Sequence, residues 1–270
     1  MPSLSSTFAD LRARGQIGLL PFIPAGYPDL ATTQALLPAL EEAGASAIEI
    51  GIPFSDPIAD GPTIQAAFTA ALAKGIKLAD VFKAVSEVRS KVSIPLVAMV
   101  SYSIPYRYGL ERFLADAKRA GFDGMIFPDL PPPEGQHVCE AVTKAGLEHT
   151  LLVAPTTTAE RRKQIAGMCS GFLYYMSLSG ITGERDKLPE DLERNLEQIR
   201  SLTDRPVCVG FGISKPEHIA QLSGKADGAI VGSAIVKQMT RLLTSDPAPT
   251  PSEMARHIGD YCRSLLSKVR

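Results

Sequence analysis

The chain contains no tryptophan, carries almost no net charge and has no long hydrophobic run. Its 28 basic and 29 acidic residues leave a formal charge of −1, so it lacks the long-range attraction of a nucleic-acid binder. No stretch approaches the roughly 18 apolar residues of a membrane span. The amino-terminal stretch MPSLSSTFADLRARGQIGLL also lacks the apolar core of a signal peptide. These absences predict a soluble, cytoplasmic protein with neither a nucleic-acid nor a membrane partner.

The spacings of the cysteines and histidines do not indicate a metal site. The four cysteines are far apart and show no CxxC spacing, which argues against a disulfide framework or a zinc site and fits a reducing compartment. The four histidines show no metal-ligand spacing, so we expect surface or packing roles and no metal. These residues are Cys139, Cys169, Cys208 and Cys262, and His137, His149, His218 and His257.

What the chain does have is a series of short apolar runs. They read IGLLPFI, SAIEIGI, IPLVAMV, DGMIFP, EHTLLVAP, FLYYMSLS, RPVCVGFG and DGAIVGS, eight in all. None alternates between apolar and polar residues, as expected for strands that are covered on both faces of a parallel sheet. Helical patterns lie between them, of which GLERFLADAKRAG is the clearest because its apolar residues recur on one helical face.

Several of these helices end in the same way. The pairs Ala43-Gly44, Ala120-Gly121 and Ala145-Gly146 each precede a strand-like run, and glycine in the left-handed conformation commonly closes a helix. Eight helix-strand units predict a single domain over residues 1–270, a (β/α)8 TIM barrel with additional helices. An open, doubly wound sheet is the alternative, because periodicity does not show closure.

The sequence makes a specific prediction for two of the helices. Pro38 lies inside the presumed helix from Leu30 to Ala43 and predicts a kink or a late start there. The carboxy-terminal segment SEMARHIGDYCRSLLSKV is amphipathic and predicts a closing helix, preceded by the loop TSDPAPTPS.

Acidic side chains occur at and after the end of the second apolar run. In EIGIPFSDPIADGP, Glu49 lies near the carboxyl end of the strand and Asp60 lies on the following loop. Active sites of such barrels form at this end, so both carboxyls should face one cavity. Apolar surroundings should raise the Glu49 pKa toward neutrality and suit it to move protons. We interpret Asp56 as a residue that closes the turn through its backbone.

Two glycine loops follow the seventh and eighth runs. GFGIS, residues Gly210 to Ser214, and GSAIV, residues Gly232 to Val236, both combine glycine with an expected helix start. Backbone N–H groups there can hold a phosphate, which barrels of this class commonly bind after strands seven and eight. The segment SLSGITGERDKLPEDL after the sixth run has the composition of a mobile lid.

The motifs together resemble the tryptophan synthase alpha subunit family. PFIPAGYPD, IEIGIPFSDPIADGPTIQAA, GFDGMIFPDLP, LLVAPTT, FLYYMSLSGITG, VGFGIS and DGAIVGSAIV occur in the family's order and span most of the chain. The resemblance implies a lyase that cleaves indole-3-glycerol phosphate to indole and glyceraldehyde 3-phosphate without a cofactor of its own. It also implies a beta-subunit partner that holds pyridoxal phosphate, in an αββα complex with an indole tunnel.

The resemblance also implies roles for individual residues. Glu49 and Asp60 match the catalytic acids, and residues 55–62 match the loop that faces the partner. The substrate contacts implied are Phe22, Tyr174, Thr182, Gly183, Phe211, Gly212, Gly232 and Ser233, with Val100 and Phe127 as pocket walls.

The sequence departs from the family motif at one place, and three alternative functions stay open. Where many family members read Tyr-x-Asn-Pro after the third strand, this chain reads YSIPYRYG with Ile104 at the asparagine position, so contact with the beta subunit can differ. The alternatives are a stand-alone indole-releasing lyase, another phosphosugar enzyme such as an isomerase, and a non-catalytic subunit that only activates a partner. Glu49 and Asp60 argue against the last, which would need neither acid.

Overall fold

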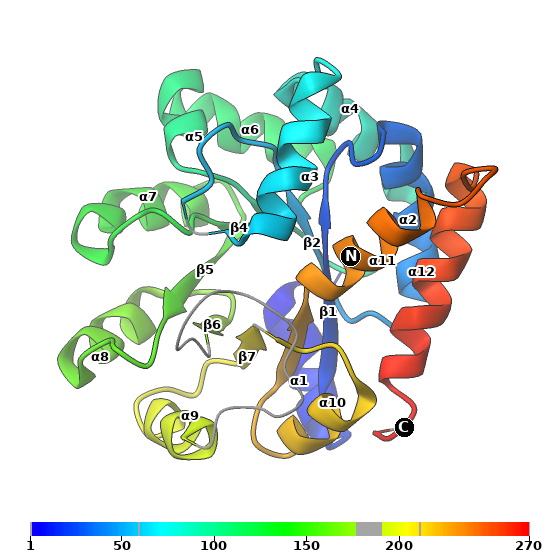
Figure 1. The fold of residues 1–270 in the computed structure, drawn as a ribbon. Helices are drawn as coiled ribbons and strands as arrows, with labels where there is room; N and C mark the ends of the chain where they lie inside the picture. Colours follow the sequence, from blue (N-terminus) through cyan, green and yellow to red (C-terminus); the bar gives the residue numbers. More distant parts are fainter. Residues whose placement is uncertain (1, 59, 177–190, 211, 270) are drawn as a thin grey trace.

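The strands form a closed parallel barrel surrounded by helices (Figure 1). This computed structural model describes residues 2–58, 60–176, 191–210 and 212–269. Each strand pairs with the next, and β8 pairs with β1, which closes the barrel. The strands are β1 Gly18–Pro24, β2 Ile48–Gly51, β3 Leu96–Met99, β4 Gly124–Ile126, β5 Glu148–Val153, β6 Leu173–Met176, β7 Val207–Gly210 and β8 Gly228–Val231. The eight apolar runs and the (β/α)8 barrel are thus confirmed, and the open sheet is excluded.

The helices cover the outside of the barrel and one of its ends. They are α1 Leu4–Ala13, α2 Leu30–Glu42, α3 Pro62–Ala73, α4 Leu78–Val88, the 3-10 helix η1 Arg89–Lys91, α5 Ser103–Tyr108, α6 Leu110–Ala120, α7 Pro132–Lys144, α8 Ala159–Met168, α9 Leu192–Arg200, α10 Pro216–Leu222, α11 Ser233–Leu242 and α12 Pro251–Leu265. Over the described residues, none of these helices has the length and apolar character needed to cross a bilayer.

The helix boundaries follow from local chemistry. The apolar stripe of α6 is buried, and the helix ends at Gly121, whose φ of 101° is left-handed. Gly44 and Gly146 also have positive φ, so the three expected glycine stops are confirmed. The expected late start of α2 is wrong: the helix begins at Leu30, where the Asp29 carboxylate accepts the Thr32 N–H at 2.7 Å, and it runs through Pro38.

Helix α2 packs along α12, which runs as a long helix beside the carboxyl terminus (Figure 1). The predicted closing helix is confirmed, with Met254, Ile258 and Leu265 buried and Tyr261 partly buried on its inner face. This contact buries the apolar face of both helices, which compensates for the hydrogen bond that a proline removes from a helix interior.

The amino-terminal end of the barrel is closed by α1. Its Phe8 ring packs edge-on against Phe172, the residue directly before β6, with centroids 5.7 Å apart, and Leu4 is fully buried. The Glu148 carboxylate accepts the Leu4 N–H at 2.6 Å, which fixes the start of the helix. Because α1 plugs this end of the barrel, we expect the site at the carboxyl ends of the strands.

Candidate active site

Glu49 points into the barrel near its open end. It lies two residues after Ala47, which belongs to the interior cluster, and alternate residues of a strand share a face. It pairs with Phe22 of β1 and Val97 of β3. The side chain is completely buried, and neither carboxyl oxygen has a hydrogen-bond partner among the described residues. Burial raises its pKa to about 8, as the sequence predicted, so the carboxyl is protonated at neutral pH.

Asp60 lies on the loop between β2 and α3 and lines a cavity at the open end of the barrel. Burial and then the negative charge of Asp129 raise its pKa to about 6, so it is mostly ionised at neutral pH. Burial also raises the pKa of the Tyr174 hydroxyl well above its usual value, and the charges of Glu49 and Asp60 raise it further. Glu49 and Asp60 therefore lie near enough to Tyr174 to oppose its ionisation, and the tyrosine keeps its proton.

The rings of Phe22 and Tyr174 lie over glycines at the strand ends. A Cβ at Gly51 would be 2.5 Å from Phe22 Cζ, and one at Gly210 would be 2.5 Å from Tyr174 Cε1. A Cβ at Gly232 would be 3.3 Å from Phe22 Cδ1. The glycines thus give the two rings the room to pack at the mouth of the barrel.

The two glycine loops differ from one another. After β8, Gly232 is the N-cap of α11, which begins at Ser233, and no described side chain caps this end. Its first N–H groups are therefore available to an anion. After β7, the expected helix start within Gly210 to Ser214 is wrong, because α10 begins at Pro216. Gly212 instead lies in a loop with a φ of 75°.

One local and one tertiary hydrogen bond hold the loop after β7. The Ser214 N–H donates to His218 Nδ1 at 3.2 Å, and the Tyr261 hydroxyl of α12 donates to the Ser214 carbonyl at 2.9 Å. The expected contacts Thr182, Gly183 and Phe211, and the expected lid, lie outside the described residues.

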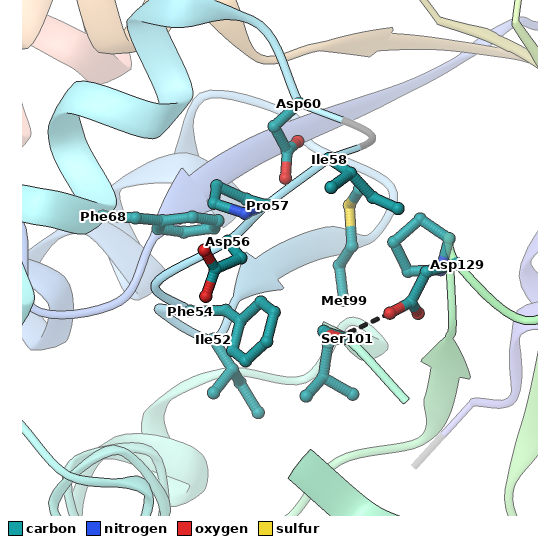
Figure 2. A pocket seen from close by; sticks show the side chains of 12 residues that line it. Ile52, Phe54, Asp56, Pro57, Ile58, Asp60, Phe68, Met99, Ser101 and Asp129 are labelled. Carbon is teal, nitrogen blue, oxygen red and sulfur yellow. Dashed lines mark hydrogen bonds between the residues drawn. The ribbon is translucent and has the colours of Figure 1, made fainter. Parts of the chain in front are cut away.

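The cavity beside Asp60 also involves residues that the sequence analysis missed. Asp129, after β4, accepts hydrogen bonds from the Ser101 hydroxyl at 2.6 Å and the Tyr102 N–H at 2.8 Å. Figure 2 shows Asp60, Asp129 and Ser101 around this cavity. Asp129 could have been found by the reasoning used for Glu49, because it follows an apolar run in DGMIFPD.

The structure also places the two predicted pocket-wall residues, Val100 and Phe127, and the predicted turn residue Asp56. Val100 lines the cavity, whereas Phe127 packs edge-on against the Tyr102 ring with centroids 5.9 Å apart. The Asp56 carbonyl accepts the Ile58 N–H at 2.9 Å, so Asp56 closes its turn through the backbone as expected.

The cysteines and histidines stand apart from this cavity's lining. All four cysteines are buried free thiols. His149 and His218 are buried, and His137 and His257 are exposed. Among the described residues, no group of three or more His, Cys, Asp or Glu side chains is placed to hold a metal ion.

A closed parallel barrel with perturbed carboxyls at the open ends of its strands is the arrangement of a (β/α)8-barrel enzyme. A family model described as "Tryptophan synthase alpha chain" matches residues 8–258. The chain belongs to the tryptophan synthase alpha chain family and is an enzyme.

Individual relatives match over the whole length. The tryptophan synthase alpha chain of Chloroflexus aurantiacus is 45% identical over 270 residues, covering 100% of this chain and 99% of the relative. That of Rippkaea orientalis is 44% identical over 271 residues with the same coverage. Among solved structures, the tryptophan synthase a2b2 complex of Pyrococcus furiosus superimposes with a TM-score of 0.85 at 40% identity, covering 92% of this chain and 97% of the other. A structure from Aquifex aeolicus gives 0.87 at 34% identity, covering all of both chains.

Proposed function

We propose that the chain is a carbon–carbon lyase that cleaves indole-3-glycerol phosphate to indole and D-glyceraldehyde 3-phosphate by a retro-aldol reaction. The observation that carries the proposal is the pair of carboxyls with opposite protonation states at the open end of the barrel. The pKa of Glu49 is raised to about 8 and that of Asp60 to about 6, so near pH 7 one is an acid and the other a base.

Glu49 acts as the general acid. The bond to be broken joins indole C3 to the glycerol phosphate chain, and an indole carbanion is a poor leaving group. Protonation of C3 by Glu49 turns the ring into an electron sink. The deprotonated carboxylate then accepts the proton of the side-chain hydroxyl as the aldehyde forms, so one group serves both proton transfers.

Asp60 stabilises the charge that develops on the ring. As C3 gains a proton, positive charge accumulates at the ring nitrogen, and an ionised carboxylate that accepts the ring N–H stabilises it. Phe22 and Tyr174, packed at the strand ends, form apolar walls for the indole. The chemistry needs no metal and no cofactor of this chain.

The phosphate end binds at the loops after β7 and β8. The N-terminus of α11 supplies uncapped N–H groups and the Ser233 hydroxyl, and Gly212 and Gly232 let the backbone approach the anion. Thr182, Gly183 and Phe211 complete the contacts in this proposal.

A beta subunit that carries pyridoxal phosphate is the proposed partner, in an αββα complex in which indole passes to it as a substrate for tryptophan synthesis. The Pyrococcus furiosus relative is described as an a2b2 complex with mutual activation. In this chain the large hydrophobic side chains that are exposed among the described residues are Ile58 (84%) and Tyr106 (73%). Ile58 lies on the loop after β2 and Tyr106 lies on the short helix α5 after β3, both at the open end of the barrel, where a partner would bury them.

The test is steady-state release of glyceraldehyde 3-phosphate from indole-3-glycerol phosphate, with and without a cognate beta subunit. We expect slow turnover that rises steeply with the partner, and Glu49→Gln should lower it by about 10²–10⁴-fold with substrate binding retained. Fast turnover that ignores the partner would indicate a stand-alone lyase. Absence of turnover under both conditions would refute the assigned reaction.

A further inference from the structure

The cavity that Asp60 lines contains an unusual concentration of negative charge. Asp56, Asp60 and Asp129 all line it, and its other described lining residues include no lysine, arginine or histidine. Each carboxylate comes from the loop after β2 or the loop after β4, so the loops of two non-adjacent strands bring the charges together (Figure 2).

Asp129 differs from Asp56 in how firmly it is held. One of its oxygens accepts the Ser101 hydroxyl at 2.6 Å and the other accepts the Tyr102 N–H at 2.8 Å. Both donors belong to the loop after β3, so the carboxylate ties the β3 and β4 loops together. These two hydrogen bonds fix the position of the Asp129 carboxylate in the cavity. Asp56 is exposed, and its side chain accepts the hydroxyl of the adjacent Ser55.

We infer that Asp129 is a positioning residue for Asp60: fixed by Ser101 and Tyr102, it holds a negative charge in the cavity and strengthens Asp60 as a hydrogen-bond acceptor. This role rests on the proposed function, in which Asp60 accepts the ring N–H. A like charge in a poorly solvated cavity makes the second carboxylate more basic, and a more basic acceptor binds a developing cation more strongly.

The other groups near Asp60 fit this assignment. Asp129 is the charged group that adds to burial in raising the pKa of Asp60. From the barrel interior, Glu49 is protonated at neutral pH and Tyr174 keeps its proton, so neither adds a charge there. Asp56 lies at the exposed rim of the same cavity, where water screens its charge.

The experiment is a titration of Asp60 by ¹³C NMR in the full chain labelled at aspartate carboxyl carbons. The Asp60 resonance is assigned by its loss in Asp60→Asn. In Asp129→Asn the amide oxygen can still accept the Tyr102 N–H, and the Ser101 hydroxyl can turn to accept from the amide. We expect this change to lower the titration midpoint of Asp60 by about 0.5 pH unit or more.

Two controls separate charge from geometry. Ser101→Ala removes one hydrogen bond and leaves the Asp129 charge, whereas Asp56→Asn removes a charge from the exposed rim; both should move the Asp60 midpoint by less than half as much. An unchanged midpoint in Asp129→Asn, or an equal shift in either control, overturns the assignment. If Asp129→Asn does not fold, Asp129→Ser supplies the uncharged variant.

Activity provides the second readout. In Asp129→Asn the acid limb of the pH profile of kcat should move to lower pH in step with the NMR midpoint, and kcat at pH 8 should fall while KM changes less than twofold. A change in KM alone would indicate a merely structural clamp and overturn the assignment. Because the NMR midpoint does not depend on turnover, a wild-type chain that fails to cleave indole-3-glycerol phosphate would refute the proposed function separately.

Discussion

The ring of Tyr174 occupies the space in which Gly210 would carry a side chain. A Cβ at Gly210 would lie 2.5 Å from Tyr174 Cε1, closer than such atoms approach in folded proteins. The two residues come from adjacent strands, where Gly210 pairs with Met176, two residues after Tyr174. The missing side chain on β7 therefore sets where the tyrosine of β6 lies relative to Glu49 and Asp60.

Gly210→Ala should displace the Tyr174 ring and destabilise the chain by about 1–3 kcal/mol through overpacking. Tyr174→Ala in the same chain should relieve the clash, giving a coupling energy of about 1 kcal/mol or more in a double-mutant cycle measured by urea unfolding. Gly167→Ala is the control: its Cβ meets nothing within 4 Å, and alanine favours the α8 helix. Additive effects of the two changes at Gly210 and Tyr174 would contradict this packing argument.

Glu49 should make stability fall as pH rises. Its folded pKa of about 8 exceeds the unfolded value near 4.3, so between these values the folded state binds the extra proton. The cost is absent below about pH 4 and grows by up to about 1.4 kcal/mol per pH unit until pH 8. Glu49→Gln removes the titration, so its free energy of unfolding relative to wild type should be higher at pH 8 than at pH 5. A pH-independent difference would show that Glu49 is not buried as a neutral acid.

The alkaline limb of the activity profile should also report Glu49. The proposed acid must be protonated in the free enzyme, so kcat/KM for indole-3-glycerol phosphate should fall above about pH 8. The phosphate group of the substrate titrates near pH 6 and does not contribute to this limb. Constant kcat/KM between pH 7 and pH 10 would exclude Glu49 as the general acid.

Asp227 should be an ionic support at the amino-terminal end of the barrel. Its buried carboxylate accepts Arg12 Nε at 2.6 Å and the Val207 N–H at 2.7 Å. Burial opposes its ionisation, but these hydrogen bonds together with the positive charges of Arg200 and Arg12 outweigh burial and lower its pKa. Asp227→Asn should therefore cost about 1–3 kcal/mol at pH 7, because Arg12 and Arg200 lose their charged partner while water screens these partly exposed guanidinium groups.

The stabilisation by Asp227 is present above the unfolded pKa near 3.9 and is lost as pH falls through the lower folded value. The difference between Asp227→Asn and wild type should accordingly shrink toward pH 3. Asp260→Asn, which breaks the exposed pair with Arg263, should change the free energy of unfolding by less than about 0.5 kcal/mol. Equal effects of the two substitutions at pH 7 would be incompatible with this assignment.

The exposed side chains Ile58 and Tyr106 should contribute to binding of the beta subunit. Ile58→Asp and Tyr106→Asp each place a charge where a partner would bury an apolar group, and should raise the Kd for the beta subunit about tenfold or more. The turnover of the free chain should stay within about twofold for Tyr106→Asp, because Tyr106, unlike Ile58, is not among the residues that line the cavity beside Asp60. Calorimetric titration with the beta subunit measures the first effect, and an unchanged Kd would place the interface elsewhere.

The sequence by itself determined the eight strands, the glycine-terminated helices and the position of Glu49. These depend on local information: unbroken apolar runs form buried parallel strands, and glycine adopts the positive φ that ends a helix. The barrel's open end then follows from the direction of the strands, which places a carboxyl at a strand end beside the site.

The tertiary structure decided what depends on contacts between distant segments. The sequence did not reveal that Asp129 ties the β3 loop to the β4 loop, nor that Tyr174 fills the space over Gly210. The sequence pattern also placed the start of α10 too early and predicted that Pro38 would delay the start of α2, which begins at Leu30. In α2, the Asp29 cap and packing on α12 stabilise the helix through the proline, because buried contacts contribute more than local propensity.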